Sequence, residues 1–213
     1  MQIAVLTFPG MTGLDVLGPY EVLSRVPEAR LRFVAREPGP ITTDTGMLTI
    51  QAEAGIDEVD AADVFIVGGG PAASVGAVMQ DRETLDWIAR LHAGTRYTAS
   101  VCNGSWILGA AGVLEGKRAG CHWLGLDALA GFGAEACADR VVVDGKLWTA
   151  GGVTSGIDMA LTFVAEVVGE DFARTLQLAL QYDPKPPFEG GTPETSPEHI
   201  VKALRDNASA VLG

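Results

Sequence analysis

Short apolar runs rich in β-branched residues alternate along the chain with segments in which apolar residues recur every three or four positions. The first pattern is typical of buried strands and the second of amphipathic helices. We predict strands over residues 3–8, 31–36, 63–70, 96–101, 140–144 and 147–152. We predict helices over residues 84–91, 105–114, 157–168 and 171–182.

The order of these elements predicts an α/β fold. Strands that are apolar throughout and alternate with helices indicate a largely parallel sheet covered on both faces. A length of 213 residues predicts one domain over residues 1–213. Residues 183–197 contain five prolines and two glycines, so we expect an extended segment on the surface or against a partner subunit. A terminal helix over residues 197–212 should follow, with Ser196 as its N-cap.

Charge and composition argue against several classes of partner. The chain has 27 acidic and 15 basic residues, a net charge of -12, which disfavours nucleic acid and anionic membranes. The opening MQIAVLTFPG lacks the basic region of a secretory signal, and residues 99–114 are too few and too polar to span a bilayer. Three cysteines without a CxxC spacing indicate neither a disulfide framework nor a zinc site. We therefore expect a cytoplasmic protein without a bound metal.

Cys102 falls where the strand predicted over residues 96–101 meets a run of small, helix-forming residues. In parallel sheets, ligands bind beyond the carboxyl ends of the strands, which is where this thiol is placed. A sharp strand-to-helix turn would hold the side chain toward a cleft, and the helix dipole would favour the thiolate. Gly104 and Ser105 are the small neighbours that such a turn needs. We interpret Cys102 as a nucleophile; the alternative is a buried structural cysteine.

Two other strand ends are expected at the same edge of the sheet. The strand predicted over residues 63–70 ends in three glycines, whose N–H groups could face negative charge developing on a substrate; a simple tight turn is the alternative. Asp15 follows the first strand and precedes Gly18 and Pro19, where we expect the first helix to begin. Asp15 is thereby placed within reach of Cys102, although a lone acid at this position is also typical of a helix cap or of a surface residue.

His122 lies 20 residues after Cys102 and next to Trp123. A cysteine–histidine couple is a common way to activate a thiol, so His122 is a further candidate for the site. A packed histidine beside a tryptophan is the alternative. We expect an apolar substrate pocket, because Trp106, Trp123, Ile157 and Phe188 lie in or near these segments.

Several longer motifs carry a resemblance to known proteins: FPGMTGLDVLGPYEVL, EPGPITTDTG, FIVGGG, SVCNGSWILGAAGVLEGKRAGCHW, WTAGGVTSGIDMAL and QLALQYDPKPPFEGGTP. With these motifs the chain resembles the ThiJ/PfpI superfamily of class I glutamine-amidotransferase-like proteins and, within it, the isocyanide (isonitrile) hydratases. The resemblance implies a flavodoxin-like three-layer α/β sandwich with a cysteine nucleophile elbow. It also implies a homodimer with neither a metal nor an organic cofactor.

The resemblance also implies roles for individual residues. Cys102 would be the nucleophile and Asp15 the general acid/base in the hydration of an organic isocyanide to an N-substituted formamide. Backbone amides of Gly69, Gly70 and Asn103 would line the site and orient substrate and water. His122 matches the family's histidine after the elbow and is not assigned a catalytic role.

The chain departs from the hydratase pattern at three places. Asn103 stands where these enzymes usually have threonine, Gly68 replaces the proline of the usual Pro-Gly-Gly turn, and residues 119–122 read Ala-Gly-Cys-His in place of Ala-Thr-Thr-His. Two other functions use the same cysteine. One is glyoxalase-, deglycase- or amidase-like chemistry on a carbonyl substrate, and the other is a thiol-based redox or sensor role.

Overall fold

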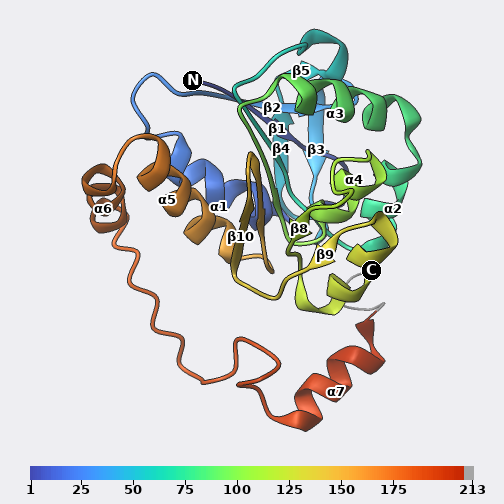
Figure 1. The fold of residues 1–213 in the computed structure, drawn as a ribbon, viewed down its shortest axis with the longest axis vertical. Coiled ribbons are helices and arrows are strands. Elements are labelled where there is room, and N and C mark those ends of the chain that lie inside the picture. Colours follow the sequence, from blue (N-terminus) through green and yellow to red (C-terminus); the bar gives the residue numbers. More distant parts are fainter. Residues whose placement is uncertain (209–213) are drawn as a thin grey trace.

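The computed structural model describes residues 1–208 and contains a central seven-stranded sheet (Figure 1). The strands run in the order β10-β11-β7-β6-β1-β2-β5, and every neighbouring pair is parallel except β10 and β11. The strands are β1 (Gln2–Leu6), β2 (Arg30–Ala35), β5 (Ala54–Gly55), β6 (Val64–Val67), β7 (Tyr97–Val101), β10 (Val141–Asp144) and β11 (Leu147–Ala150). The predicted mostly parallel α/β sheet is confirmed.

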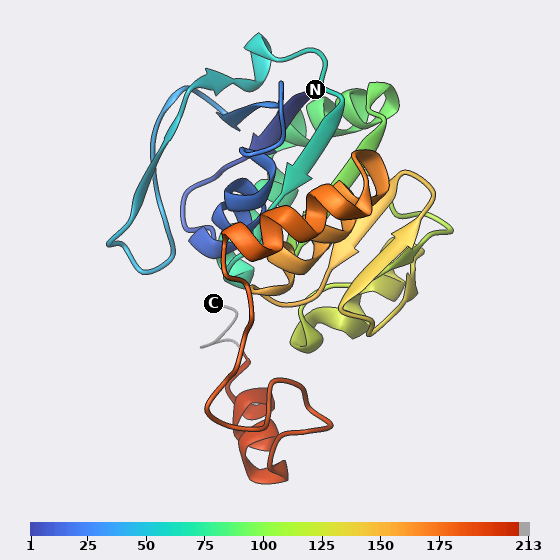
Figure 2. The same cartoon turned by 90° about the vertical axis from the view of Figure 1, so that its left-hand side faces the viewer.

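Helices cover both faces of this sheet, as Figures 1 and 2 show from two sides. On one face lie α1 (Gly13–Leu23) and α5 (Ser155–Val167), with α6 (Glu170–Ala179) packed against α5. On the other face lie α2 (Ala72–Gln80), α3 (Arg82–Gly94) and α4 (Gly104–Ala110). All four residues of β6 are buried, as expected for a central strand enclosed by two helical layers.

Several small elements were not predicted from the sequence. A hairpin of β3 (Gly39–Thr42) and β4 (Thr49–Ala52) extends from the body, and a short parallel pair joins β8 (Arg118–Ala119) to β9 (Glu135–Ala136). Two 3₁₀ segments, η1 (Ile56–Glu58) and η2 (Trp123–Phe132), complete the folded body. These elements are short or irregular, so they leave a weak periodic signal.

Two predicted helix boundaries are wrong. The first helix begins at Gly13 and not near Gly18, and it contains Pro19. Proline lacks the N–H group that would make one of the helix's hydrogen bonds. Its ring packs closely against Gly156 of α5, where an added Cβ atom would lie 3.0 Å from the Pro19 Cδ. The helix predicted over residues 105–114 ends at Ala110, because Gly112 adopts a left-handed φ of +78° that stops it.

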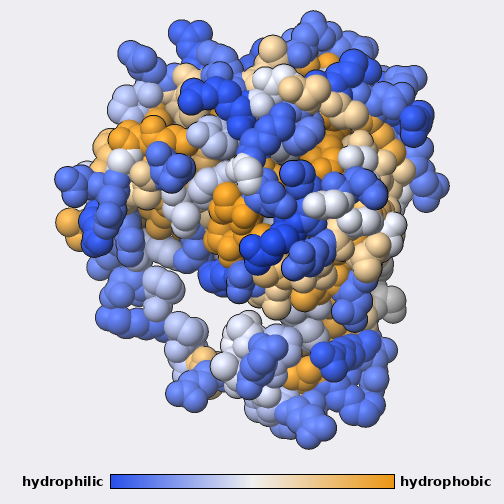
Figure 3. Space-filling model, in the orientation of Figure 1, coloured by the Kyte–Doolittle hydropathy of each residue, from blue (hydrophilic) through white to orange (hydrophobic). Residues whose placement is uncertain are grey.

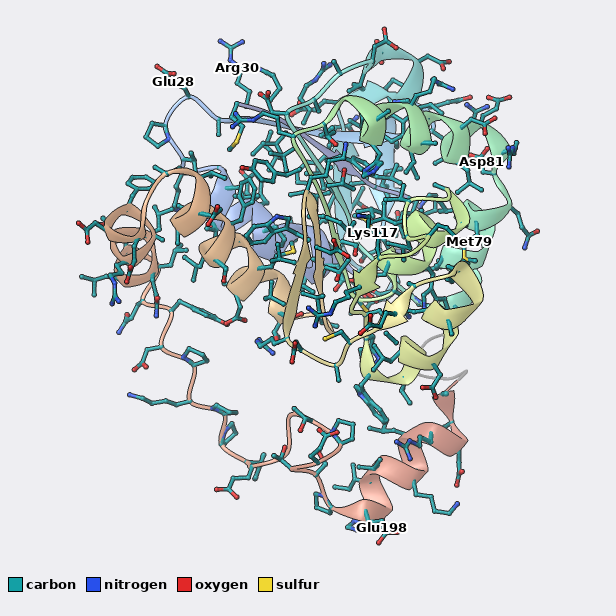
Figure 4. All side chains as sticks on the ribbon, viewed as in Figure 1. Glu28, Arg30, Met79, Asp81, Lys117 and Glu198 are labelled. Atoms are coloured by element: carbon teal, nitrogen blue, oxygen red, sulfur yellow. The ribbon has the colours of Figure 1, made fainter. Side chains whose placement is uncertain are left out.

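Residues 183–208, here called the C-terminal arm, leave the body after α6 (Figures 1 and 2). The arm has no regular element before α7 (Glu198–Asp206), and no residue of α7 is buried. Glu198, labelled in Figure 4, marks the start of this helix, far from the sheet. The helix predicted over residues 197–212 is observed over Glu198–Asp206, and its N-cap is Pro197 and not Ser196 as predicted. Residues 209–213 lie outside the described part of the chain. Within residues 1–208, we find no helix with both the length and the apolar character needed to cross a bilayer.

Candidate active site

The sheet order brings three chain segments to one edge. Strands β1, β6 and β7 run side by side in the same direction, so their carboxyl ends lie together. Asp15 comes from the first turn of α1, which follows β1. Gly69 and Gly70 follow β6, and Cys102 follows β7 directly. This edge of a parallel sheet is the usual place for a ligand site.

Cys102 occupies a strained turn between β7 and α4. Its φ of +58° lies in the left-handed region that non-glycine residues rarely adopt, and such strain clusters at functional sites. The Cys102 N–H donates to the carbonyl oxygens of Ala150 at 3.1 Å and Gly151 at 2.8 Å. The second residue after Cys102 must be glycine, because a Cβ atom at Gly104 would lie 2.4 Å from the Val67 carbonyl oxygen. These contacts form the predicted nucleophile elbow.

Asp15 is fully buried next to this thiol. Its Oδ2 accepts a hydrogen bond from the Gly69 N–H at 2.9 Å, and its Oδ1 has no hydrogen-bond partner among the described residues. Burial raises the pKa of Asp15 to about 7, although the Gly69 N–H and the adjacent Cys102 thiol each lower it in part. Near neutral pH, Asp15 can therefore both accept and donate a proton.

Cys102 is 4% exposed. Burial raises the pKa of Cys102 well above its ordinary value, and the charge of Asp15 raises it further. The backbone N–H groups of Asn103 and Val153 face the sulfur and lower this pKa only in part. The predicted resting thiolate is therefore wrong, because burial outweighs these N–H groups. The thiol therefore holds its proton beside the Asp15 carboxyl.

The two glycines after β6 contact the start of α4. A Cβ atom at Gly69 would lie 2.5 Å from the Asn103 backbone nitrogen, so this position tolerates no side chain. The Asn103 Nδ2 donates to the Gly70 carbonyl oxygen at 3.4 Å. The Asn103 side chain is fully buried, and its Oδ1 lacks a partner within residues 1–208. Gly69, Gly70 and Asn103 are thus brought together with Cys102 and Asp15.

His122 packs against the turn that follows β11. Its Nδ1 accepts a hydrogen bond from the Leu124 N–H at 3.3 Å, and a Cβ atom at Gly152 would lie 2.6 Å from its Cδ2. Burial lowers the pKa of His122, so the ring is neutral near pH 7. Among the described residues, no hydrogen bond joins His122 to Cys102. The ring instead lines a cavity that lies next to the elbow and is described below.

A cavity of about 860 Å³ lies beside the elbow. Gly152 and Val153 line it from the body, and Thr192 and Glu194 line it from the C-terminal arm. Figure 3 shows a gap between the body and the arm. Asp15, Cys102 and Asn103 do not line this cavity. Val153 does line it, and its N–H faces the Cys102 sulfur.

The lining of this cavity differs from the apolar pocket expected from the sequence. Of the four apolar residues expected to line a pocket, Trp123 lines this cavity, whereas Trp106, Ile157 and Phe188 do not. Four charged residues also line it: Asp127, Arg140, Glu194 and Arg205. This cavity is therefore not the apolar substrate pocket expected from the sequence, and that expectation stays a prediction.

The turn that carries Val153 was missed by the sequence analysis. It follows β11, which pairs in parallel with β7, so the carboxyl end of β11 reaches the same edge as Cys102. The signal was present in the motif WTAGGVTSG, where two glycines end an apolar strand.

The described residues hold no group of three or more His, Cys, Asp or Glu side chains that could bind a metal ion.

Comparisons with known proteins show the family to which the chain is related. The chain is 45% identical over 212 residues to an isonitrile hydratase from Pseudomonas putida, covering 100% of this chain and 92% of that protein. It is 28% identical over 149 residues to a deglycase from Thermococcus kodakarensis, covering 68% of this chain and 87% of the deglycase. The crystal structure of a ThiJ/PfpI family protein from Pseudomonas syringae superposes with a TM-score of 0.95 at 40% identity, covering 99% of this chain and 87% of that one. The DJ-1/PfpI family profile matches residues 1–166, and the chain belongs to the DJ-1/PfpI family.

Proposed function

We propose that the protein is an isocyanide hydratase, a lyase that converts an organic isocyanide, R–N≡C, and water into the formamide R–NH–CHO. The observation that carries this proposal is the buried pair of Asp15, whose pKa is raised to about 7 by burial, and the protonated Cys102 thiol. The terminal carbon of an isocyanide must receive both a nucleophile and a proton, and this pair can supply both. The 45% identity to an isonitrile hydratase over the whole chain supports the same reaction.

The first half-reaction moves one proton and forms one bond to carbon. The Asp15 carboxylate takes the proton of the Cys102 thiol, and the sulfur attacks the terminal carbon of the isocyanide. Asp15 then returns that proton to the same carbon, which yields the thioimidate R–N=CH–S–Cys. The N–H groups of Asn103 and Val153 that face the sulfur stabilise the thiolate while it forms.

The second half-reaction consumes water. Asp15, ionised again, takes a proton from a water molecule that attacks the thioimidate carbon. The imine nitrogen receives this proton from Asp15. The resulting R–NH–CH(OH)–S–Cys expels the thiolate to give the formamide, and Asp15 passes the hydroxyl proton of the intermediate to the sulfur. We assign the orientation of substrate and water to the turn of Gly69 and Gly70 and to Asn103, which lie against the elbow.

Assay of the purified protein with a small alkyl isocyanide tests this function. We expect formamide to form far faster than in buffer, and we expect Cys102→Ala to abolish the difference. Cys137→Ala is the matched control. The Cys137 thiol contacts Arg118 on β8 and Asp139 in the loop after β9, away from the elbow. Formamide at the uncatalysed rate would refute the proposal.

A carbonyl-directed reaction is the second candidate, supported by the deglycase relative. The same thiol and acid could add to an aldehyde, with Asn103 in place of the hydratases' usual threonine. Turnover of methylglyoxal and of an isocyanide on one preparation separates the two reactions. A redox-sensing role has less support, because a thiol that is 4% exposed and has a raised pKa oxidises slowly.

We also propose that the protein is a cytoplasmic homodimer in which the C-terminal arm contacts the second copy. All three cysteines are free, which suits a reducing compartment. In the arm, Phe188 is 84% exposed and Ile200 is 44% exposed, and an isolated helix as short as α7 is marginal in water. A second copy would bury this apolar surface. Light scattering should give a dimer mass for the full chain, and a monomer mass after removal of residues 183–213 would assign the contact to the arm.

A further inference from the structure

We propose that Arg140, together with Asp158 and Tyr182, is a positioning group that clamps the turn at residues 151–154 and so keeps the Val153 N–H directed at the Cys102 sulfur. The proposal rests on the role of Cys102 as nucleophile in the proposed function. Arg140 lies between β9 and β10, far from Cys102 in sequence, and it lines the cavity beside the elbow.

Arg140 holds this turn at both ends. Its backbone carbonyl oxygen accepts the Gly151 N–H at 3.0 Å. Its guanidinium donates to the Thr154 Oγ1 at 3.2 Å, and Thr154 is the N-cap residue of α5. Gly152 and Val153 therefore lie between Gly151 and Thr154, both of which are hydrogen-bonded to Arg140.

The guanidinium is itself held in place by its neighbours. Its Nε and one Nη both donate to Asp158 Oδ2, at 2.9 Å and 2.6 Å. The Tyr182 hydroxyl donates to the same oxygen at 3.0 Å. Asp158 lies in the first turn of α5, so the network links β10, the start of α5 and the end of the folded body. A planar, multiply bonded guanidinium suits this task better than a flexible ammonium group.

The same turn is tied directly to the nucleophile. The Cys102 N–H donates to the carbonyl oxygens of Ala150 and Gly151, and the Val153 N–H faces the sulfur. Release of Thr154 would let the Val153 N–H rotate away, whereas the Cys102 backbone would remain held by β11. The side chain of Arg140 is 53% exposed and that of Asp158 is 31% exposed, so the pair should add little to overall stability. Its effect is expected in the local geometry of the turn.

Amide hydrogen exchange at Val153, followed by NMR, tests the clamp without any substrate. In Arg140→Gln we expect exchange at Val153 to become about tenfold faster, while the amides of β1 and β6 keep their rates. Arg140→Lys should give an intermediate rate. Arg174→Gln is the matched control, since Arg174 makes the same two-donor contact with Glu170 on α6, away from the turn.

The ionisation of Cys102, followed through its labelled ¹³Cβ resonance, gives a second readout. Loss of the Val153 N–H should move this ionisation to higher pH in Arg140→Gln and leave it in place in Arg174→Gln. Thr154→Val and Tyr182→Phe each remove one hydrogen bond of the network. If Arg140→Gln does not fold, faster amide exchange at Val153 in these two variants tests the clamp instead. Wild-type exchange at Val153 in all folded variants would overturn the proposal. Faster exchange at Val153 in a protein that hydrates no isocyanide would uphold the clamp and refute the proposed function.

Discussion

The sheet edge that carries Cys102 and the C-terminal arm are organised in opposite ways. Asp15 is fully buried and Cys102 is 4% exposed at the edge, and both are held by contacts within one chain. In the arm, Phe188 is 84% exposed and α7 buries no residue. Where the arm does return to the body, the Arg205 guanidinium lies 5.8 Å from the centre of the Trp123 ring.

The two regions differ in what determines their properties. The chemistry proposed for the edge depends on burial, because burial sets the protonation of Cys102 and Asp15. The arm contributes few contacts to the body, so we attribute its conformation to what it touches in an assembly. Substitutions at the edge should therefore change activity, whereas substitutions in the arm should change association.

The largest effect is expected at the nucleophile. Cys102→Ala should lower kcat/KM for an isocyanide by about 10³-fold or more, because no bond to carbon can form. The melting temperature should stay near that of the wild type, since an alanine retains the Cβ packing. A variant that keeps even a tenth of the activity would contradict the role of the edge, and steady-state kinetics measures this directly.

The next effect concerns the acid. Asp15→Asn should lower kcat by about 10²- to 10³-fold, because the amide cannot accept the thiol proton. In the wild type, burial raises the pKa of Asp15 to about 7, and the mechanism starts from the carboxylate. Activity should thus rise with pH through about 7 and then level off. A pH profile that falls through this range would show that the acid must begin protonated.

The same carboxyl should make stability depend on pH. Its pKa is about 7 in the fold against an ordinary value of 3.8, so the folded state binds more protons between these values. The stabilisation is complete below the unfolded pKa and is lost as the pH rises through about 7. The free energy of unfolding should fall by up to about 4 kcal/mol over this range through Asp15. Urea unfolding should show this slope in the wild type, and a slope of equal size in Asp15→Asn would assign it to other groups.

A pair of glycines tests the packing of the edge. Gly69→Ala places a methyl group 2.5 Å from the Asn103 nitrogen, and we expect a loss of about 1–3 kcal/mol in the free energy of unfolding together with lower activity. Gly76→Ala on α2 meets nothing within 4 Å and should be neutral or slightly stabilising. Equal effects in the two variants would show that the elbow tolerates extra volume.

The smallest effect on folding is expected in the arm. Phe188→Ser should change the free energy of unfolding of the dilute protein by less than about 0.5 kcal/mol and should weaken dimerisation, measured by sedimentation. Leu178→Ser removes a comparably exposed apolar side chain (81%) from α6, outside the arm. A dimer that is weakened by Leu178→Ser and not by Phe188→Ser would place the interface elsewhere.

The sequence predicted the parts of the molecule that local pattern controls. The apolar runs of β1, β6 and β7 and the turn at Cys102 predicted the sheet and the elbow. Asp15 was placed correctly at the same edge although the start of α1 was not, because Pro19 is tolerated inside the helix. The pattern could not show the degree of burial, so the protonation of Cys102 was wrong. Arg140 and Val153 were missed because their contacts depend on β11 pairing with β7.

The central claim is that the Cys102 sulfur bonds to the isocyanide carbon. Rapid acid quench of the enzyme with excess isocyanide, followed by mass spectrometry, tests it most directly. We predict an adduct equal to the mass of the isocyanide on the peptide that carries Cys102, present within one turnover and absent in Cys102→Ala. Formamide production at full rate with Cys102 unmodified throughout, or with the adduct on Cys121 or Cys137, would contradict the claim.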